Sequence, residues 1–249
     1  MNSTSSTIAV IADIHGNLPA LTAVLADIDR RGVTRIFNLG DSLCGSLWPG
    51  ATARLLQERA IPSLCGNQDR MLCAPTPAFA AGPDFALAQA ELSTADWAWL
   101  RAQPPLLADS GLLFCHGTPN SDDTYLLEAV HPTHVGMRSG DEIDALLGDT
   151  GAHVICCGHS HQPHLVQTPG GRLVVNPGSV GIPAYDDDAP WPHVMEAGSP
   201  HARYALLASS AGGWQIELIA LAYDHEDAAR LAERRGRPDR ARWIRTGRM

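Results

Sequence analysis

Residues 7–17 read TIAVIADIHGN, and this stretch decides the fold class. The apolar, β-branched run Thr7–Ala12 predicts a buried strand, and polar residues begin directly after it, at Asp13. Segments with helical spacing and apolar runs of strand length then alternate: a helix over Pro19–Arg31, a strand over Arg35–Leu39, a helix over Pro49–Arg59 and a strand over Ile61–Cys65. Because the connections are short, this order predicts an α/β fold with a parallel sheet.

The second half of the chain has a different pattern. Further helices are expected over Asp84–Arg101, Asp141–Leu147 and Asp224–Arg235, and further buried strands over Leu112–Cys115 and His153–Cys157. Antiparallel hairpins are expected around two glycine-containing turns, pairing His164–Gln167 with Arg172–Val175 and Tyr204–Ala208 with Trp214–Ala222. We expect one domain over residues 1–249, with a mobile loop at about 182–200 and a basic segment at 228–249.

The composition excludes several kinds of chemistry. The chain has 249 residues, with 27 acidic and 18 basic side chains and a formal net charge of −9. All 18 basic residues are arginine, which excludes a P-loop lysine, a Schiff-base lysine and a Ser-Lys dyad. The acidic balance argues against an extended nucleic-acid footprint, and we interpret the arginines of residues 228–249 as a solvated helix face and chain end.

Cysteine usage and hydropathy indicate a cytoplasmic protein. None of the six cysteines forms a C-x-x-C pair, and several lie in apolar runs, so we expect reduced thiols. No stretch approaches the roughly 18 apolar residues that a membrane span needs, so we expect no membrane partner. The oligomeric state cannot be read from the sequence, and a homodimer stays open.

Five short motifs share a position directly after a predicted strand. In open α/β sheets, ligands bind beyond the carboxyl ends of the strands, so the polar residues of these motifs should converge. They are Asp13 and His15 in D-I-H, Asp41 in G-D, Asn67 in G-N, His116 in H-G, and His159 and His161 in G-H-S-H. The glycines that precede three of them would allow the backbone to approach a crowded centre.

The residue types of this set are typical of a metal site. Imidazole, carboxylate and amide oxygen together favour divalent first-row metals, and no cysteine accompanies them. Seven ligands are too many for one ion and suit two ions that share a bridging carboxylate. Because two such ions can activate a shared water, the set predicts attack of a metal-bound hydroxide on a phosphoester.

The motifs D-x-H, G-D, G-N, H-G and G-H-x-H, in this order, resemble those of the calcineurin-like metallophosphoesterase superfamily. The string Asn176-Pro177-Gly178-Ser179, after G-H-S-H-Q-P, is similar to the small prokaryotic phosphodiesterase subgroup of the YfcE type. The resemblance implies a four-layer α/β/β/α sandwich with two mixed β-sheets. It also implies a division of the ligands: Asp13, His15 and His161 on one metal, Asn67, His116 and His159 on the other, and Asp41 as the bridge.

The chain departs from the pattern of that superfamily at two places. Many members carry G-N-H, whereas Gln68 follows Asn67 here and cannot act as a general acid at neutral pH. The arginine that follows the G-D motif in Ser/Thr protein phosphatases is absent after Asp41. Both departures argue against a protein phosphatase and favour good leaving groups or an acid supplied elsewhere. The candidates for that acid are His131, His134 and His193.

We therefore expect a dinuclear-metal phosphoesterase that hydrolyses a small phosphodiester or phosphomonoester, with the diester preferred. Asp41, Asn67 and His116 are expected to serve catalysis as well as metal binding. Manganese is the first expectation for the metal, with Fe, Ni, Co or Zn as alternatives. The other class that stays open is a metal-binding scaffold of the same fold with little activity. A metallo-β-lactamase is excluded because Pro163 stands where its motif requires aspartate.

Overall fold

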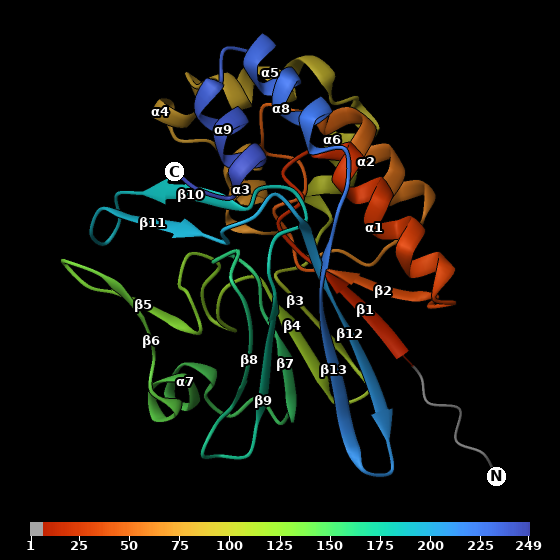
Figure 1. Ribbon diagram of the computed structural model, residues 1–249, viewed down its shortest axis with the longest axis vertical. Helices are drawn as coiled ribbons and strands as arrows, with labels where there is room; N and C mark the ends of the chain where they lie inside the picture. The colour runs from red at the N-terminus through yellow and green to blue at the C-terminus, as the bar shows by residue number, and fades with distance from the viewer. Residues whose placement is uncertain (1–6) are drawn as a thin grey trace.

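The computed structural model describes residues 7–249, and two mixed β-sheets form its centre (Figure 1). The first sheet has the order β13-β12-β1-β2, with the bounds Gly213–Leu221, Ala202–Ser210, Thr7–Ile11 and Arg35–Asn38. The second has the order β3-β4-β7-β9-β8, with the bounds Leu106–Asp109, Leu112–Cys115, Val154–Cys156, Leu173–Pro177 and Pro163–Gln167. The pairs β1–β2, β4–β7 and β7–β9 are parallel, and the other pairs of these sheets are antiparallel.

Successive residues of β1 enter two different hydrophobic cores. Ile11 packs against the helix α1 (Leu18–Arg30), whereas Val10 lies in the core between the two sheets. This alternation follows from the period of 2 along a strand, and it explains why the strand reads as an unbroken apolar run. Between the sheets, the Phe37 ring stacks on the Phe114 ring with the centroids 4.3 Å apart.

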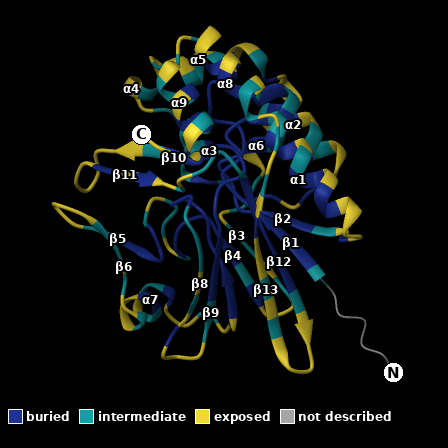
Figure 2. Cartoon of the chain, viewed as in Figure 1, coloured by how far each residue is buried: buried dark blue, intermediate teal, exposed yellow. Residues whose placement is uncertain are grey.

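Helices cover the outer faces of the two sheets. The helix α1 lies on the first sheet, and α7 (Gly140–Leu147) packs Ile143 into a core with Ile155 and Val174 of the second sheet. The expected α/β/β/α sandwich with two mixed sheets is therefore confirmed. Exposed residues are found on the outer faces of the helices and at the tip of the β12–β13 hairpin (Figure 2).

The remaining helices gather above the carboxyl end of β1 (Figure 1). They are α2 (Pro49–Glu58), α3 (Asn67–Cys73), α4 (Pro77–Ala80), α5 (Pro83–Glu91), α6 (Thr94–Arg101), α8 (His225–Arg234) and α9 (Pro238–Thr246). Two antiparallel ribbons flank the sheets: β5 (Glu128–Val130) with β6 (Val135–Met137), and β10 (Ala184–Asp187) with β11 (His193–Glu196). The β10–β11 ribbon lies within residues 182–200, for which a loop was expected.

The prediction of a third strand over Ile61–Cys65 is wrong. The segment forms only an isolated parallel bridge between Asn38 and Ser63, beside the end of β2. Two backbone hydrogen bonds hold it: Asn38 N donates to Pro62 O and Leu64 N donates to Asn38 O, each at 2.9 Å. Because Pro62 has no N–H to donate, the segment does not extend into a longer ladder.

The single helix predicted over Asp84–Arg101 is two helices, α5 and α6. The break falls at Ser93, which begins α6 through a capping box. Ser93 Oγ accepts from Asp96 N at 3.2 Å, and the Asp96 carboxylate accepts from Ser93 N at 2.9 Å. The sequence S-T-A-D carried this signal, but the apolar spacing on both sides concealed the break.

The two predicted hairpins are confirmed. Gln167 pairs with Leu173 next to the β8–β9 turn, and Ser210 pairs with Gly213 next to the β12–β13 turn. The expected helix over residues 224–235 is α8, whereas the sequence pattern predicts no helix in the place of α9. Within residues 7–249, no helix has the length and apolarity needed to cross a membrane.

Candidate metal centre

Four strands end around one point, and the predicted site residues follow them. Asp13 and His15 come after β1, Asp41 after β2, His116 after β4, and His159 and His161 after β7, while Asn67 begins α3. Backbone hydrogen bonds tie these loops together: Asp13 N donates to Gly40 O at 3.0 Å, His15 N to Asp41 O at 2.9 Å and Gly158 N to His116 O at 2.7 Å. The expected convergence at the strand ends is therefore present.

Five of the seven residues have a left-handed backbone. Their φ angles are 57° at Asp13, 51° at His15, 52° at Asp41, 68° at His159 and 59° at His161. Among residues 7–249, only two other non-glycine residues have a positive φ. Residues with side chains rarely adopt this conformation, and such strain collects at functional sites. The chain thus accepts strained backbone where the candidate ligands lie.

A glycine beside Asp41 allows the loops to approach closely. A Cβ atom at Gly66 would lie 2.2 Å from Asp41 Oδ1 and 2.5 Å from Asp41 N. At Gly40, where φ is 95°, a Cβ would lie 2.5 Å from Gly66 N. Neither position has room for a side chain, which is why the sequence places glycine before both Asp41 and Asn67.

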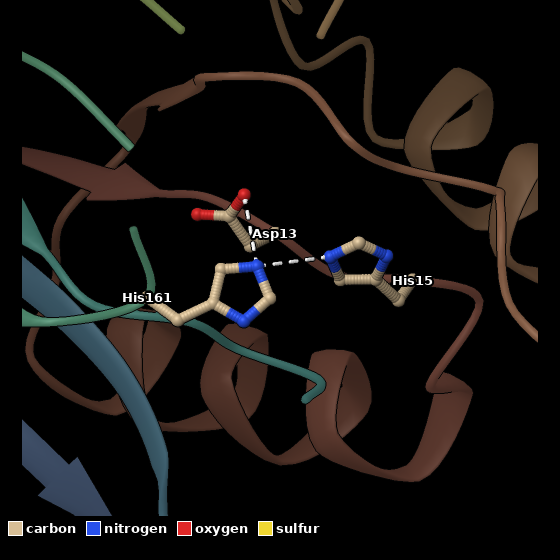
Figure 3. A group of neighbouring side chains, drawn as sticks. All are labelled: Asp13, His15 and His161. Carbon is tan, nitrogen blue, oxygen red and sulfur yellow. Dashed lines mark hydrogen bonds and ion pairs between the residues drawn. The ribbon is translucent and has the colours of Figure 1, made fainter. Parts of the chain in front are cut away.

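Asp13, His15 and His161 form a first group, whose possible ligand atoms all lie within 4.8 Å of one another (Figure 3). The Nδ1 atoms of His15 and His161 face the backbone carbonyls of Cys44 and Ile182 at 2.8 and 2.7 Å. Because a carbonyl oxygen only accepts, both Nδ1 atoms carry the proton. The two Nε2 atoms lie 3.1 Å apart, and His161 Nε2 lies 3.4 Å from Asp13 Oδ1.

Asp13, Asp41 and His116 form a second group within the same distance. His116 Nδ1 donates to Leu39 O at 2.8 Å, and its Nε2 lies 3.5 Å from Asp41 Oδ2 and 3.1 Å from Asn67 Oδ1. Asp13 belongs to both groups, whereas the family resemblance gives the bridging position to Asp41. Asp13 Oδ1 is buried and has no hydrogen-bond partner.

His159 lies beside the second group. Its ring centroid is 5.1 Å from that of His116, and its backbone N donates to Asp13 Oδ2 at 3.2 Å. It lines one cavity together with His15, Asp41, Asn67 and His161. The structure therefore brings all seven predicted residues together, with Asn67 and His159 at the edge of the two groups.

The electrostatics of the centre favour positive charge at its middle. Burial lowers the pKa of His15 to about 4, and His161 adds to this shift, so the His15 imidazole is neutral. Burial opposes the charged form of His116 as well, but Asp41 and Asp13 raise its pKa to about 10. A proton is therefore held between His116 and the carboxylates, at a place where a divalent cation would compete with it.

Residues 7–195 match the sequence model of the calcineurin-like phosphoesterase superfamily domain. The chain belongs to this superfamily. The family resemblance drawn from the motifs is thereby confirmed, and membership supports a hydrolase that acts on phosphoesters. An uncharacterized protein of Methanocaldococcus jannaschii is 27% identical over an alignment of 247 residues, which covers 90% of this chain and 90% of that protein.

Two crystal structures share the superfamily fold over nearly the whole chain. A metallophosphoesterase from Sphaerobacter thermophilus has a TM-score of 0.74 and 20% identity, covering 98% of this chain and 100% of that chain. A hypothetical protein from Pyrococcus horikoshii OT3 has a TM-score of 0.73 and 18% identity, covering 97% and 98%. At these identities the likeness shows the fold, and it includes the part of this chain beyond residue 195.

The candidate site has a wall that the motifs do not predict. Tyr185 of β10, together with Arg237, Arg240 and Trp243 of the α9 segment, lines the cavity that contains the candidate ligands. The only sequence signal was the excess of arginine over residues 228–249. That signal was interpreted as a solvated face, because a local pattern does not tell which arginines turn inward.

The three candidate acids have different surroundings. His193 is buried, and its Nδ1 donates to Trp191 O at 2.8 Å while its Nε2 lies 3.0 Å from Tyr125 Oη. His131 lines a second cavity of about 680 Å³ and stacks with His134 at a centroid distance of 4.7 Å. None of the three lines the cavity of the metal centre, whereas Gln68 does.

Proposed function

We propose that this protein is a dinuclear-metal phosphoesterase that prefers small phosphodiesters. The observation that carries the proposal is the pair of His15 and His161 Nε2 atoms, 3.1 Å apart and next to Asp13 Oδ1, a buried carboxylate oxygen without a hydrogen-bond partner. Three possible ligand atoms therefore converge in a buried place, and a carboxylate oxygen without a partner there is costly. A cation among these atoms would remove that cost, so these residues fit a metal ion.

The second ion would be held by Asp41, Asn67, His116 and His159. When bound, a pair of divalent ions would acidify a water molecule and neutralise charge on the phosphoryl group. The chain itself orients the imidazoles, since the carbonyls of Cys44, Leu39 and Ile182 fix the Nδ1 protons of His15, His116 and His161. Manganese stays our first choice, with Fe, Ni, Co or Zn as alternatives.

The preference for diesters rests on two features of the site. The cavity of the metal centre shares Asn67, His159 and Asp187 with the cavity of about 680 Å³, so a leaving group bound there would be next to the phosphoryl group. This volume is within the range of small-molecule sites. Gln68, which lines the cavity of the metal centre, can donate a hydrogen bond but releases no proton, so substrates with good leaving groups are favoured.

The test starts from protein stripped of metal and reloaded with Mn²⁺. We expect about two metal ions per chain by elemental analysis, and faster hydrolysis of bis-p-nitrophenyl phosphate than of p-nitrophenyl phosphate. Replacing Asp41 by Asn should reduce bound metal and abolish turnover. Full metal content and full activity in Asp41→Asn would contradict the role of Asp41. Two bound metals without turnover in the unaltered protein would favour a scaffold.

A further inference from the structure

The helix α9 closes the cavity above the metal centre. This cavity has a volume of about 180 Å³ and is lined both by candidate ligands and by Arg237, Arg240 and Trp243. Trp243 anchors the wall, because it packs with Ile182 and Ala184 of the segment that begins the β10 ribbon. In so small a cavity, a phosphoryl group at the metal centre would lie within reach of α9.

The guanidinium group of Arg240 has hydrogen-bond donors to spare. Its side chain is only 11% exposed, and Nη2 donates to Asp84 Oδ2 at 2.7 Å. Its Nε and Nη1 atoms are buried and have no acceptor. Arginine stays charged at all ordinary pH values, so these buried N–H groups are costly until an acceptor arrives.

The neighbouring residues hold the Arg240 side chain in place, but they do not accept all of its hydrogen bonds. Asp84 also accepts from Ser46 Oγ and lies 3.4 Å from Arg237 Nη1. Arg237 itself pairs with Asp239, with Nη2 donating to Oδ2 at 2.6 Å. The Arg237 side chain is thus paired with Asp239. The Arg240 side chain contacts one carboxylate, that of Asp84, and its Nε and Nη1 atoms have no acceptor.

Two carboxylates in the lining of the cavity make this positive charge necessary. Asp186 and Asp187 line the same cavity, so an entering phosphate would meet two more carboxylates besides those of the metal centre. Gln68 carries no charge to offset them. The superfamily match ends at residue 195, so Arg237 and Arg240 lie outside the part of the chain that it covers.

We propose that Arg240, which lines the cavity, binds the phosphoryl group of the substrate by donating from its guanidinium group to the non-bridging oxygens. A planar guanidinium matches the geometry of two phosphate oxygens and forms strong, charge-assisted hydrogen bonds. Arg240 is then a catalytic residue that the motifs do not contain, and Asp84 is its positioning residue. This inference rests on the proposed function, since it takes the phosphoryl group to lie at the metal centre.

The experiment compares three variants of the Mn²⁺-loaded protein. Arg240→Gln removes the charge, and Arg240→Lys keeps the charge but loses the planar fork. The matched control is Arg242→Gln, since Arg242 lies on the exposed face of the same helix and its side chain makes no hydrogen bond or ion pair with any described residue. The readouts are binding of inorganic phosphate by calorimetry, kcat and KM on bis-p-nitrophenyl phosphate, bound metal, and the melting temperature.

We expect Arg240→Gln to weaken phosphate binding about 10-fold or more and to lower kcat about 10²-fold with unchanged metal content. Arg240→Lys should recover part of both losses, and Arg242→Gln should behave as the unaltered protein. If Arg240→Gln melts too low to be assayed, Arg240→Lys is compared with Arg242→Gln instead. Equal phosphate affinity and equal kcat in these two variants would overturn the inference.

The outcomes separate this inference from the proposed function. An unaltered protein that hydrolyses the diester, together with an Arg240→Gln variant that matches Arg242→Gln, would overturn the role of Arg240 and leave the function standing. An unaltered protein that binds metal but hydrolyses neither ester would remove the function, and the inference with it. Loss of metal in Arg240→Gln would also overturn the inference, because Arg240 would then support the metal centre instead of the phosphate.

Discussion

Single residues decide how closely the loops of this site approach. Gly66 is one such residue, because an added Cβ would lie 2.2 Å from Asp41 Oδ1. We expect Gly66→Ala to displace the Asp41 carboxylate, to lower metal content and to reduce turnover at least about 10²-fold, as a misplacement of about 1 Å does in other active sites. The control is Gly212→Ala, where the nearest atom to the new Cβ is 3.8 Å away.

Elemental analysis and steady-state kinetics check this prediction. Gly212→Ala should keep full metal content and full activity. If Gly66→Ala also keeps both, the loop has room to move, and the close approach of Gly66 to Asp41 is not required for the site.

A substitution at Gln68 tests whether the site lacks a general acid for the leaving group. It lines the cavity, and its backbone N donates to Asp41 Oδ1 at 2.9 Å. We expect Gln68→His to raise the rate on esters with poor leaving groups by up to about 10²-fold, because a histidine can protonate the leaving oxygen. Rates on p-nitrophenyl esters should change little. Gln68→Asn, which keeps an amide, is the control.

The kinetic comparison uses phenyl and p-nitrophenyl phosphodiesters with the same protein preparation. A loss of rate on every substrate in Gln68→His, with Gln68→Asn also impaired, would mean that the Gln68 amide has a specific contact to the substrate.

At the scale of the elements, capping determines where the helices of the cap region begin. Ser93 separates α5 from α6 through its hydrogen bonds with Asp96. We expect Ser93→Ala to lower the free energy of unfolding by about 0.5–2 kcal/mol, the usual cost of losing a helix N-cap. Denaturant unfolding measures it, and Thr94→Ala is the control, since the exposed Thr94 side chain makes no hydrogen bond with any described residue. Equal stability of the two variants would contradict the capping role.

Local patterns predicted the elements whose hydrogen-bond partners are near in sequence or whose faces are uniformly apolar. The β8–β9 and β12–β13 hairpins and the strand β1 are of this kind. Ile61–Cys65 has the apolar character of a strand, but Pro62 limits its pairing to one bridge. A prediction from apolar character alone does not take into account that proline lacks the backbone N–H that a longer ladder needs.

The candidate ligands could be located because four of the five motifs follow a strand, and the fifth, Gly66-Asn67, follows the segment that forms a bridge beside β2. Arg240 could not, since its partner Asp84 lies 156 positions away in the sequence. An arginine that turns into a cavity and one that faces solvent have the same appearance in a local charge pattern. Only the packing of α9 against β10 distinguishes Arg240 from Arg242.

At the scale of the whole molecule, the metal centre joins loops from both sheets. Asp13 follows the first sheet and His161 follows the second, so a metal ion held by both would tie the two layers together. We expect chelation to lower the melting temperature and added Mn²⁺ to restore it, by about 4 kcal/mol of stabilisation at a thousand-fold excess over the dissociation constant. Thermal unfolding with and without metal measures this, and an unchanged melting temperature would contradict a site that bridges the sheets.

The strand order has a consequence for how the protein is made. In the first sheet, β1 lies between β2 and β12, and Ala9 is paired with Leu206. During synthesis on the ribosome, β1 therefore waits for about two hundred further residues before the edge that pairs with β12 is covered. The arginine wall on α9 arrives later still. The nascent chain thus presents an apolar strand edge until β12 has been made, and the cavity beside the candidate ligands can close only after α9 has been translated.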